Sequence, residues 1–77
     1  METIGERLGA VRRRRLLTQA ALAQASGVAL ITVTRLENSG EEANPRPDTI
    51  KKLAAALDVD PAWLMFGNED LMGKAAA

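Results

Sequence analysis

Residues 18–38 read TQAALAQASGVALITVTRLEN, and their apolar positions recur at the three- and four-residue intervals of helices. Gly27 divides the stretch, because glycine enters the left-handed conformation that ends many helices without a Cβ penalty. Thr18 can cap the first helix, since a threonine oxygen accepts a hydrogen bond from an early backbone N–H. The pattern predicts two short helices, over about 19–25 and 29–38, joined by a tight turn. The side chains expected to point inward are Leu22, Ala23, Val28, Val33 and Leu36.

The second of these helices would carry a mixed outer face. The positions expected on it are Leu30, Ile31, Thr34 and Arg35, with Thr32 at the margin. Two short helices that cross at a glycine turn have the layout of a helix-turn-helix motif, whose second helix faces a DNA groove. The planar guanidinium of Arg35 matches guanine O6 and N7, although a surface arginine paired with a neighbouring acid is the plainer alternative.

Leu30 and Ile31 are unusual on such a face, and they leave three interpretations open. They could contact thymine methyl groups in the major groove. They could form a protein-binding patch, since adjacent exposed aliphatic side chains often mark an interaction site. The helix could also be rotated so that one of the two is buried.

A helix is predicted over about 4–15, before the central stretch. Thr3 and Glu6 have the spacing of a capping box at its start. The arginine run 12–15 ends it, where cations complement the helix dipole. Arg12 is expected to point partly inward, whereas Arg13 and Arg14 should be in water. The face expected to be buried holds Ile4, Leu8 and Val11.

Two more helices follow the central stretch. Residues 39–47 are predicted to form a loop, because Pro45 and Pro47 bar a helix through them. Pro47 suits the first turn of a helix over 47–57, with Asp48 at its positive end. The buried face of that helix is expected to hold Ile50, Leu53, Ala54 and Leu57. Asp60 as N-cap and Pro61 after it start a short helix over 61–66, which Gly67 ends.

Five short helices predict an all-α fold, a compact bundle built around the helix-turn-helix. Residues 1–67 are expected to form the domain and 68–77 a tail, whose closing Ala75–Ala77 resemble expression-vector residues. The chain has no apolar run of 18 residues, so no membrane span is expected. Residues 1–15 do not resemble a signal peptide. The cytoplasm is therefore the expected location.

The residue inventory argues against an enzyme. The chain has no histidine and no cysteine, so the commonest general base, the commonest metal ligand and any disulfide are missing. Glu41 and Glu42 form a loop charge pair without a partner, and Asp58 and Asp60 are better explained by capping. No catalytic residue, metal or cofactor is expected.

The charge is zero overall but unevenly distributed. Residues 1–38 carry a balance of +3 and residues 39–77 a balance of −3. One basic face could therefore bind nucleic acid on a neutral chain, while an ordinary solvated surface remains the alternative. The arginine run 12–15 likewise allows phosphate contact or a purely solubilising role.

The order and spacing of these signals resemble those of the lambda and 434 repressor and Cro family, the XRE-type helix-turn-helix regulators. The spacing runs from Gln19 through Ala23, Gly27 and Val33 to the Leu36-Glu37 pair. The resemblance continues through NPRP, TIKKLAAALDVD and PAWLMFG and covers about residues 4–67. It implies a lambda repressor-like fold and binding to double-stranded DNA.

The resemblance also implies roles for individual residues. Arg12 and Glu37 would form a buried structural ion pair between the first and third helices. The residues implied near bases are Leu30, Ile31, Thr32 and Arg35, which Thr34 joins on the outward face. The residues implied near phosphates are Gln19, Asn38 and Arg46, and Thr18 is expected to join them.

The sequence departs from the family pattern at several positions. Ala29 replaces the usual Ser or Thr cap of the third helix, and Leu16 stands where a glycine is usual. The 39–46 loop is about three residues longer than in compact members, and Glu41-Glu42 replaces cations.

Two functions follow from these observations. The first is a sequence-specific transcriptional regulator, a repressor that binds a palindromic operator as a homodimer. The second is a protein-interaction module, such as an antitoxin-like partner of another protein. The apolar residues expected at a dimer interface are Met65, Phe66, Leu71 and Met72.

Overall fold

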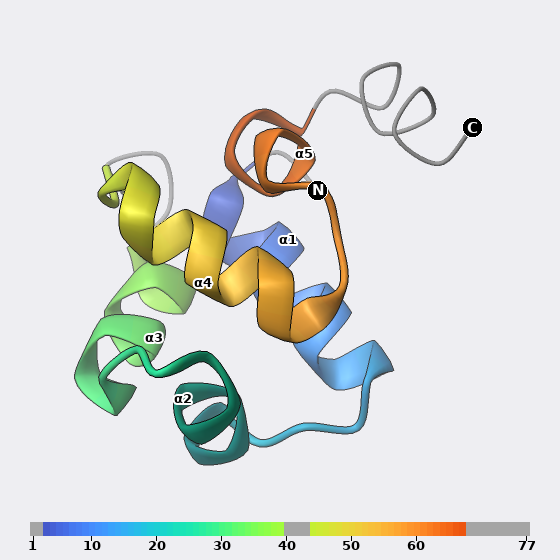
Figure 1. Ribbon diagram of the computed structural model, residues 1–77, viewed down its shortest axis with the longest axis vertical. Coiled ribbons are helices and arrows are strands. Elements are labelled where there is room, and N and C mark those ends of the chain that lie inside the picture. Colours follow the sequence, from blue (N-terminus) through green and yellow to red (C-terminus); the bar gives the residue numbers. More distant parts are fainter. Residues whose placement is uncertain (1–2, 40–43, 68–77) are drawn as a thin grey trace.

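The computed structural model describes residues 3–39 and 44–67, which fold into a bundle of five helices (Figure 1). They are α1 (Ile4–Arg14), α2 (Gln19–Ser26), α3 (Leu30–Asn38), α4 (Pro47–Leu57) and α5 (Pro61–Phe66). The prediction of an all-α fold is confirmed, and every predicted boundary lies within one residue of the observed one. None of the described helices is long and apolar enough to cross a bilayer. Residues 68–77, the expected tail, lie outside the described residues.

The first two helices begin at the predicted caps. The Thr3 hydroxyl accepts a hydrogen bond from the Glu6 N–H at 3.1 Å, and the Glu6 carboxylate accepts one from the Thr3 N–H at 3.2 Å. Thr18 Oγ1 accepts a bond from the Ala21 N–H at 3.0 Å, which starts α2. Each cap satisfies a donor that the helix itself cannot use.

The start of α5 follows the same capping chemistry, whereas α3 begins without it. Asp60 accepts bonds from the N–H groups of Ala62 and Trp63 at the start of α5. Gly27 ends α2 in the left-handed region, with φ at 77°. Ala29 precedes α3 without any side-chain cap, as its methyl group requires.

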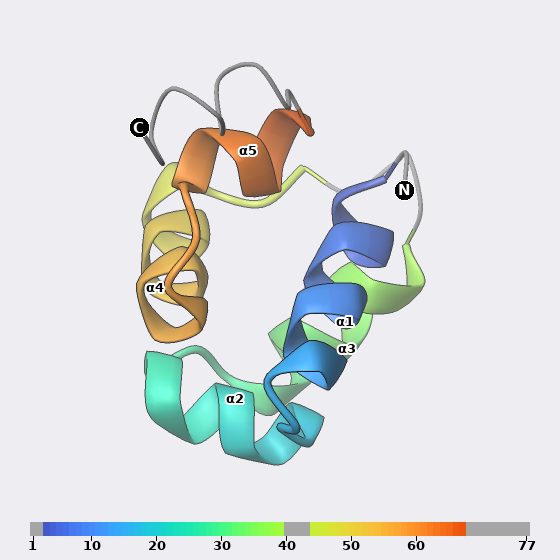
Figure 2. The same cartoon turned by 90° about the vertical axis from the view of Figure 1, so that its right-hand side faces the viewer.

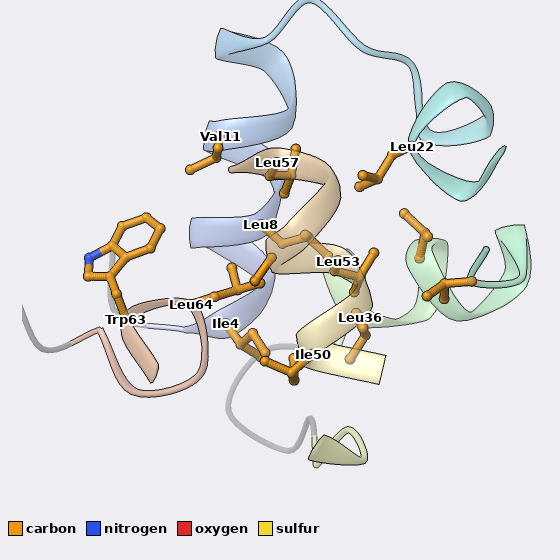
Figure 3. Packing of buried hydrophobic residues seen from close by; sticks show 13 residues of the cluster. Ile4, Leu8, Val11, Leu22, Leu36, Ile50, Leu53, Leu57, Trp63 and Leu64 are labelled. Atoms are coloured by element: carbon orange, nitrogen blue, oxygen red, sulfur yellow. The ribbon is translucent and has the colours of Figure 1, made fainter. Parts of the chain in front are cut away.

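The core is built from aliphatic side chains of all five helices, together with Trp63 (Figure 3). In Figure 3 the side chains of α1, α4 and α5 gather in the middle, and Trp63 lies at the edge. Of the residues expected to point inward from the central stretch, Ala23 is half-buried against the core and the others are buried. The core residues are Ile4, Leu8, Val11, Leu22, Val28, Val33, Leu36, Ile50, Leu53, Ala54, Leu57, Trp63 and Leu64.

The bundle holds α2 and α3 at one end and α5 at the other (Figures 1 and 2). The first helix packs against α3 and α5, and α4 packs against α2 and α5. A close approach of α1 to the end of α3 depends on Gly5, because an added Cβ there would collide with the carbonyl oxygens of Leu36 and Glu37. The helices α1 and α4 thus form the scaffold that fixes the α2–α3 pair.

Candidate nucleic-acid interface

A largely buried ion pair joins α1 to α3. Arg12 donates from Nε and Nη2 to the two carboxylate oxygens of Glu37, at 2.6 and 2.9 Å. A third donor, Arg12 Nη1, binds the carbonyl oxygen of Leu17 at 2.8 Å. The two side chains are only 13% and 8% exposed. The pair implied by the family resemblance is therefore formed, and it fixes the end of α3 against α1.

The surroundings keep both partners charged. Burial favours the neutral form of Glu37, but hydrogen bonds from Arg12 and Gln19, with the nearby arginine charges, outweigh it and lower the pKa of this carboxyl. The hydrogen bond to Glu37 raises the pKa of Arg12 against the opposing effect of burial. The carboxylate of Glu37 thus acts only as an acceptor.

Gln19 extends this network to α2. Its Nε2 donates to Glu37 Oε1 at 3.1 Å, and its Oε1 accepts a bond from the Thr34 hydroxyl at 3.1 Å. The network therefore connects three helices through side chains only. Thr34, expected on the outer face, is half-buried, and its hydroxyl points toward Gln19.

The outer face of α3 carries exposed aliphatic side chains. Leu30 is 47% exposed and Ile31 is 56% exposed, so neither is buried. This excludes the rotated helix that the sequence left open. Arg35 is exposed on the same helix, and Thr32 is half-buried.

Polar groups flank this face on two sides. At the start of α2, the backbone N–H groups of Gln19 and Ala20 have no acceptor within the described residues, and such groups attract anions. At the other side, a cleft between the end of α3 and the start of α4 is lined by Arg35 and Arg46. Thr18 and Asn38, the other two expected phosphate contacts, are both exposed.

Arg7 is a buried arginine that the sequence did not lead us to expect. Arg7 is 4% exposed, and it donates to the carbonyl oxygens of Leu64 at 2.9 Å and Met65 at 2.7 Å. Burial lowers its pKa against the opposing effect of the Glu6 charge. Its position, three residues after Ile4 and on the buried face of α1, is the signal that could have revealed it.

Two further apolar side chains lie at the surface. Leu16 is 93% exposed in the left-handed region, with φ at 58°, a conformation that favours glycine. Phe66 of α5 is 72% exposed, and Met65 beside it is half-buried against the core. The other residues expected at a dimer interface, Leu71 and Met72, lie outside the described residues.

The chain is similar to proteins of known class. The HTH-type transcriptional repressor RghR of Bacillus subtilis (strain 168) is 47% identical over 66 residues, which are 86% of this chain and 48% of that protein. The HTH-type transcriptional regulator DicA of Escherichia coli (strain K12) is 34% identical over 68 residues, which are 88% of this chain and 49% of that protein. The chain thus spans about half the length of the curated relatives it matches.

A solved structure and a family model agree with these relatives. The P22 c2 repressor, crystallised in complex with a synthetic operator, superposes with a TM-score of 0.77 at 31% identity, covering 88% of this chain and all of that one. The family model described as helix-turn-helix matches residues 8–64. The chain belongs to the helix-turn-helix family of lambda repressor-like domains.

Proposed function

We propose that this chain binds double-stranded DNA as a transcriptional repressor, without enzymatic activity. The observation that supports it best is the exposed outer face of α3 beside the unbonded N-terminal amides of α2. An α-helix fits the major groove, and amides at a helix start bind phosphate oxygens. The similarity to the P22 c2 repressor, a protein crystallised with a synthetic operator, supports the same function.

In this proposal the side chains divide into base-facing and backbone-facing groups. Leu30 and Ile31 would pack against thymine methyl groups, and Arg35 would donate two hydrogen bonds to a guanine. Thr32, at the margin of the face, would contact a base or a nearby phosphate. The backbone contacts would come from Thr18, Gln19, Asn38 and Arg46.

Two copies would bind a palindromic operator as a homodimer. One domain offers one recognition helix, whereas a dimer reads two half-sites about 34 Å apart. Phe66 is exposed on α5, and this helix lies at the end of the bundle opposite α2 (Figure 2), where a symmetric contact leaves the DNA face open. Met65 would line the same interface.

Selection of bound sequences from random DNA tests this function. The expected consensus is palindromic, and its affinity should fall steeply as salt rises, because phosphate contacts release counterions. Replacing Arg35 with alanine should reduce discrimination at one base pair by about 1–3 kcal/mol. An equal loss of affinity for every sequence would instead make Arg35 a phosphate contact.

Phe66→Glu tests the dimer on the selected operator. The variant should lose affinity for the two-half-site duplex and keep that for a single half-site, while Ala55→Glu, at an exposed position of α4, should change neither. If the wild type binds no duplex in a salt-dependent manner, the proposed repressor function is contradicted. That result would favour the protein-interaction module, because the exposed Leu30 and Ile31 would then need another partner.

A further inference from the structure

We infer that Thr34 is a positioning residue: its hydroxyl fixes the side-chain amide of Gln19 so that one N–H of that amide is presented to a DNA phosphate. The inference rests on the proposed function, because it assigns a phosphate contact to Gln19. It removes Thr34 from the base-facing group and gives it a different task.

The orientation of the Gln19 amide follows from the chemistry of Glu37. The Glu37 carboxylate accepts bonds from Arg12 Nε and Nη2 and is ionised, so it offers lone pairs and no proton. The group of Gln19 that lies 3.1 Å from it must therefore be the NH2 group. The amide oxygen then faces the other way, toward α3.

The amide oxygen of Gln19 is held by Thr34. Thr34 donates its hydroxyl proton to Gln19 Oε1 at 3.1 Å, from a half-buried position. A hydroxyl has a single proton, so this bond uses the only donor that Thr34 could offer to a base. Both ends of the Gln19 amide are thus fixed, one by Glu37 and one by Thr34.

One donor of Gln19 remains unused. The NH2 group has two N–H bonds and gives one to Glu37, so the second has no acceptor among the described residues. It belongs to the first residue of α2, as do the unbonded backbone amides of Gln19 and Ala20 to the first turn. Three N–H groups at the start of α2 are then available to one phosphate. Without the Thr34 hydroxyl the amide would turn more freely, and this donor would have to be ordered during binding.

Thr34→Val tests the inference, because valine keeps the branched shape and removes the hydroxyl. Affinity for the selected operator and for an unrelated duplex should fall by the same factor, about threefold to tenfold, as expected when one side chain must be ordered during binding. Thr34→Ser keeps the hydroxyl and should retain most of the affinity. In a Gln19→Ala background, Thr34→Val should have no further effect, because the two residues act through one contact.

Side-chain amide NMR supplies a readout without DNA. The chain has two glutamines, and Gln24, which is exposed on α2, is the internal reference. In the wild type the Gln19 NH2 resonances should be displaced from those of Gln24. Thr34→Val should move them toward Gln24, and Thr34→Ser should leave them in place.

Three results would overturn the inference. They are coincident Gln19 and Gln24 resonances in the wild type, a Thr34→Val variant with unchanged affinity, and a loss confined to one base position. Each of these can occur while the wild type binds DNA, so the proposed function would stand. If Thr34→Val does not fold, the wild-type resonances and the Thr34→Ser variant decide the question.

Discussion

Arg7 and Arg12 lie five residues apart on α1, and both guanidinium groups are largely withdrawn from water in different surroundings. Arg12 meets the carboxylate of Glu37 in α3, and this contact raises its pKa. Arg7 donates to main-chain carbonyl oxygens at the end of α5, and burial lowers its pKa. One arginine thus joins α1 to the helix-turn-helix, and the other joins α1 to the opposite end of the bundle.

The two contacts depend on their partners in different ways. Removal of the Glu37 carboxylate would leave the largely buried Arg12 guanidinium without an opposite charge, which strongly lowers the free energy of unfolding. Removal of the Arg7 guanidinium would leave neutral carbonyl groups, each of which costs less. The α1–α3 junction should therefore be the more sensitive of the two to substitution.

Glu37→Ala should have the largest effect on stability. The free energy of unfolding is expected to fall by about 3–5 kcal/mol, since Arg12 would remain buried without its carboxylate. Chemical denaturation measures the loss. Asp48→Ala is the matched control, because Asp48 forms an exposed pair with Lys52 at 3.5 Å and, with its helix-dipole interaction, should cost no more than about 1 kcal/mol. Equal losses in the two variants would contradict the structural role of Glu37.

Arg7→Met should cost less, about 2–3 kcal/mol, because it withdraws donors from the carbonyls of Leu64 and Met65. Trp63, the only tryptophan of the chain, is 7% exposed in α5 and reports on this junction. Its fluorescence should shift toward longer wavelength as α5 loosens. Arg14→Met, on the exposed face of the same helix, should change neither quantity. A larger loss in Arg7→Met than in Glu37→Ala would reverse the ranking of the junctions.

A comparison of Gly27 with Gly67 distinguishes the cost of a clash with Arg7 from the cost of placing a non-glycine residue in the left-handed region. Gly27 and Gly67 both adopt a left-handed φ, at 77° and 70°. An added Cβ at Gly27 meets nothing within 4 Å, whereas at Gly67 it would lie 2.6 Å from Arg7 Nη1. Gly27→Ala should cost about 1 kcal/mol and Gly67→Ala about 2 kcal/mol, as measured by thermal unfolding. Equal costs would mean that Arg7 moves aside freely.

The smallest predicted effect is on the pH dependence of stability, which should involve the Arg12–Glu37 contact and not the contact of Arg7. Folding lowers the pKa of Glu37, so its contribution is complete above the unfolded value of about 4.3 and is lost as pH falls through the lower folded pKa. The stability difference between wild type and Glu37→Gln should be constant at neutral pH and shrink below about pH 4. The difference between wild type and Arg7→Met should show no such change, because guanidinium does not titrate there. Unfolding measured across this range gives both curves.

The fold could be predicted because its signals are local. Thr3, Thr18 and Asp60 start helices through bonds to residues two or three positions away, and Gly27 and Gly67 end them through their own backbone. Apolar spacing then identified nearly all of the core. Such features are complete in a short stretch of sequence, and no distant partner is needed to interpret them.

The site was only partly predictable, because its contacts cross between helices. Leu30, Ile31 and Arg35 lie exposed as the spacing predicted. The inward hydroxyl of Thr34 depends on Gln19, 15 residues away, and the burial of Arg7 depends on carbonyls 57 and 58 residues away. A main-chain acceptor has no side-chain signature, so the sequence alone could not assign a partner to Arg7.

In the proposed function, DNA contacts the outer face of α3 together with the start of α2. The most direct measurement is a titration of isotopically labelled protein with the selected operator, followed by the backbone amide resonances. The largest shifts are expected at Gln19, Ala20 and the exposed positions of α3, with little change within the core of α1. Largest shifts at α5, with α3 unchanged, would contradict the claim.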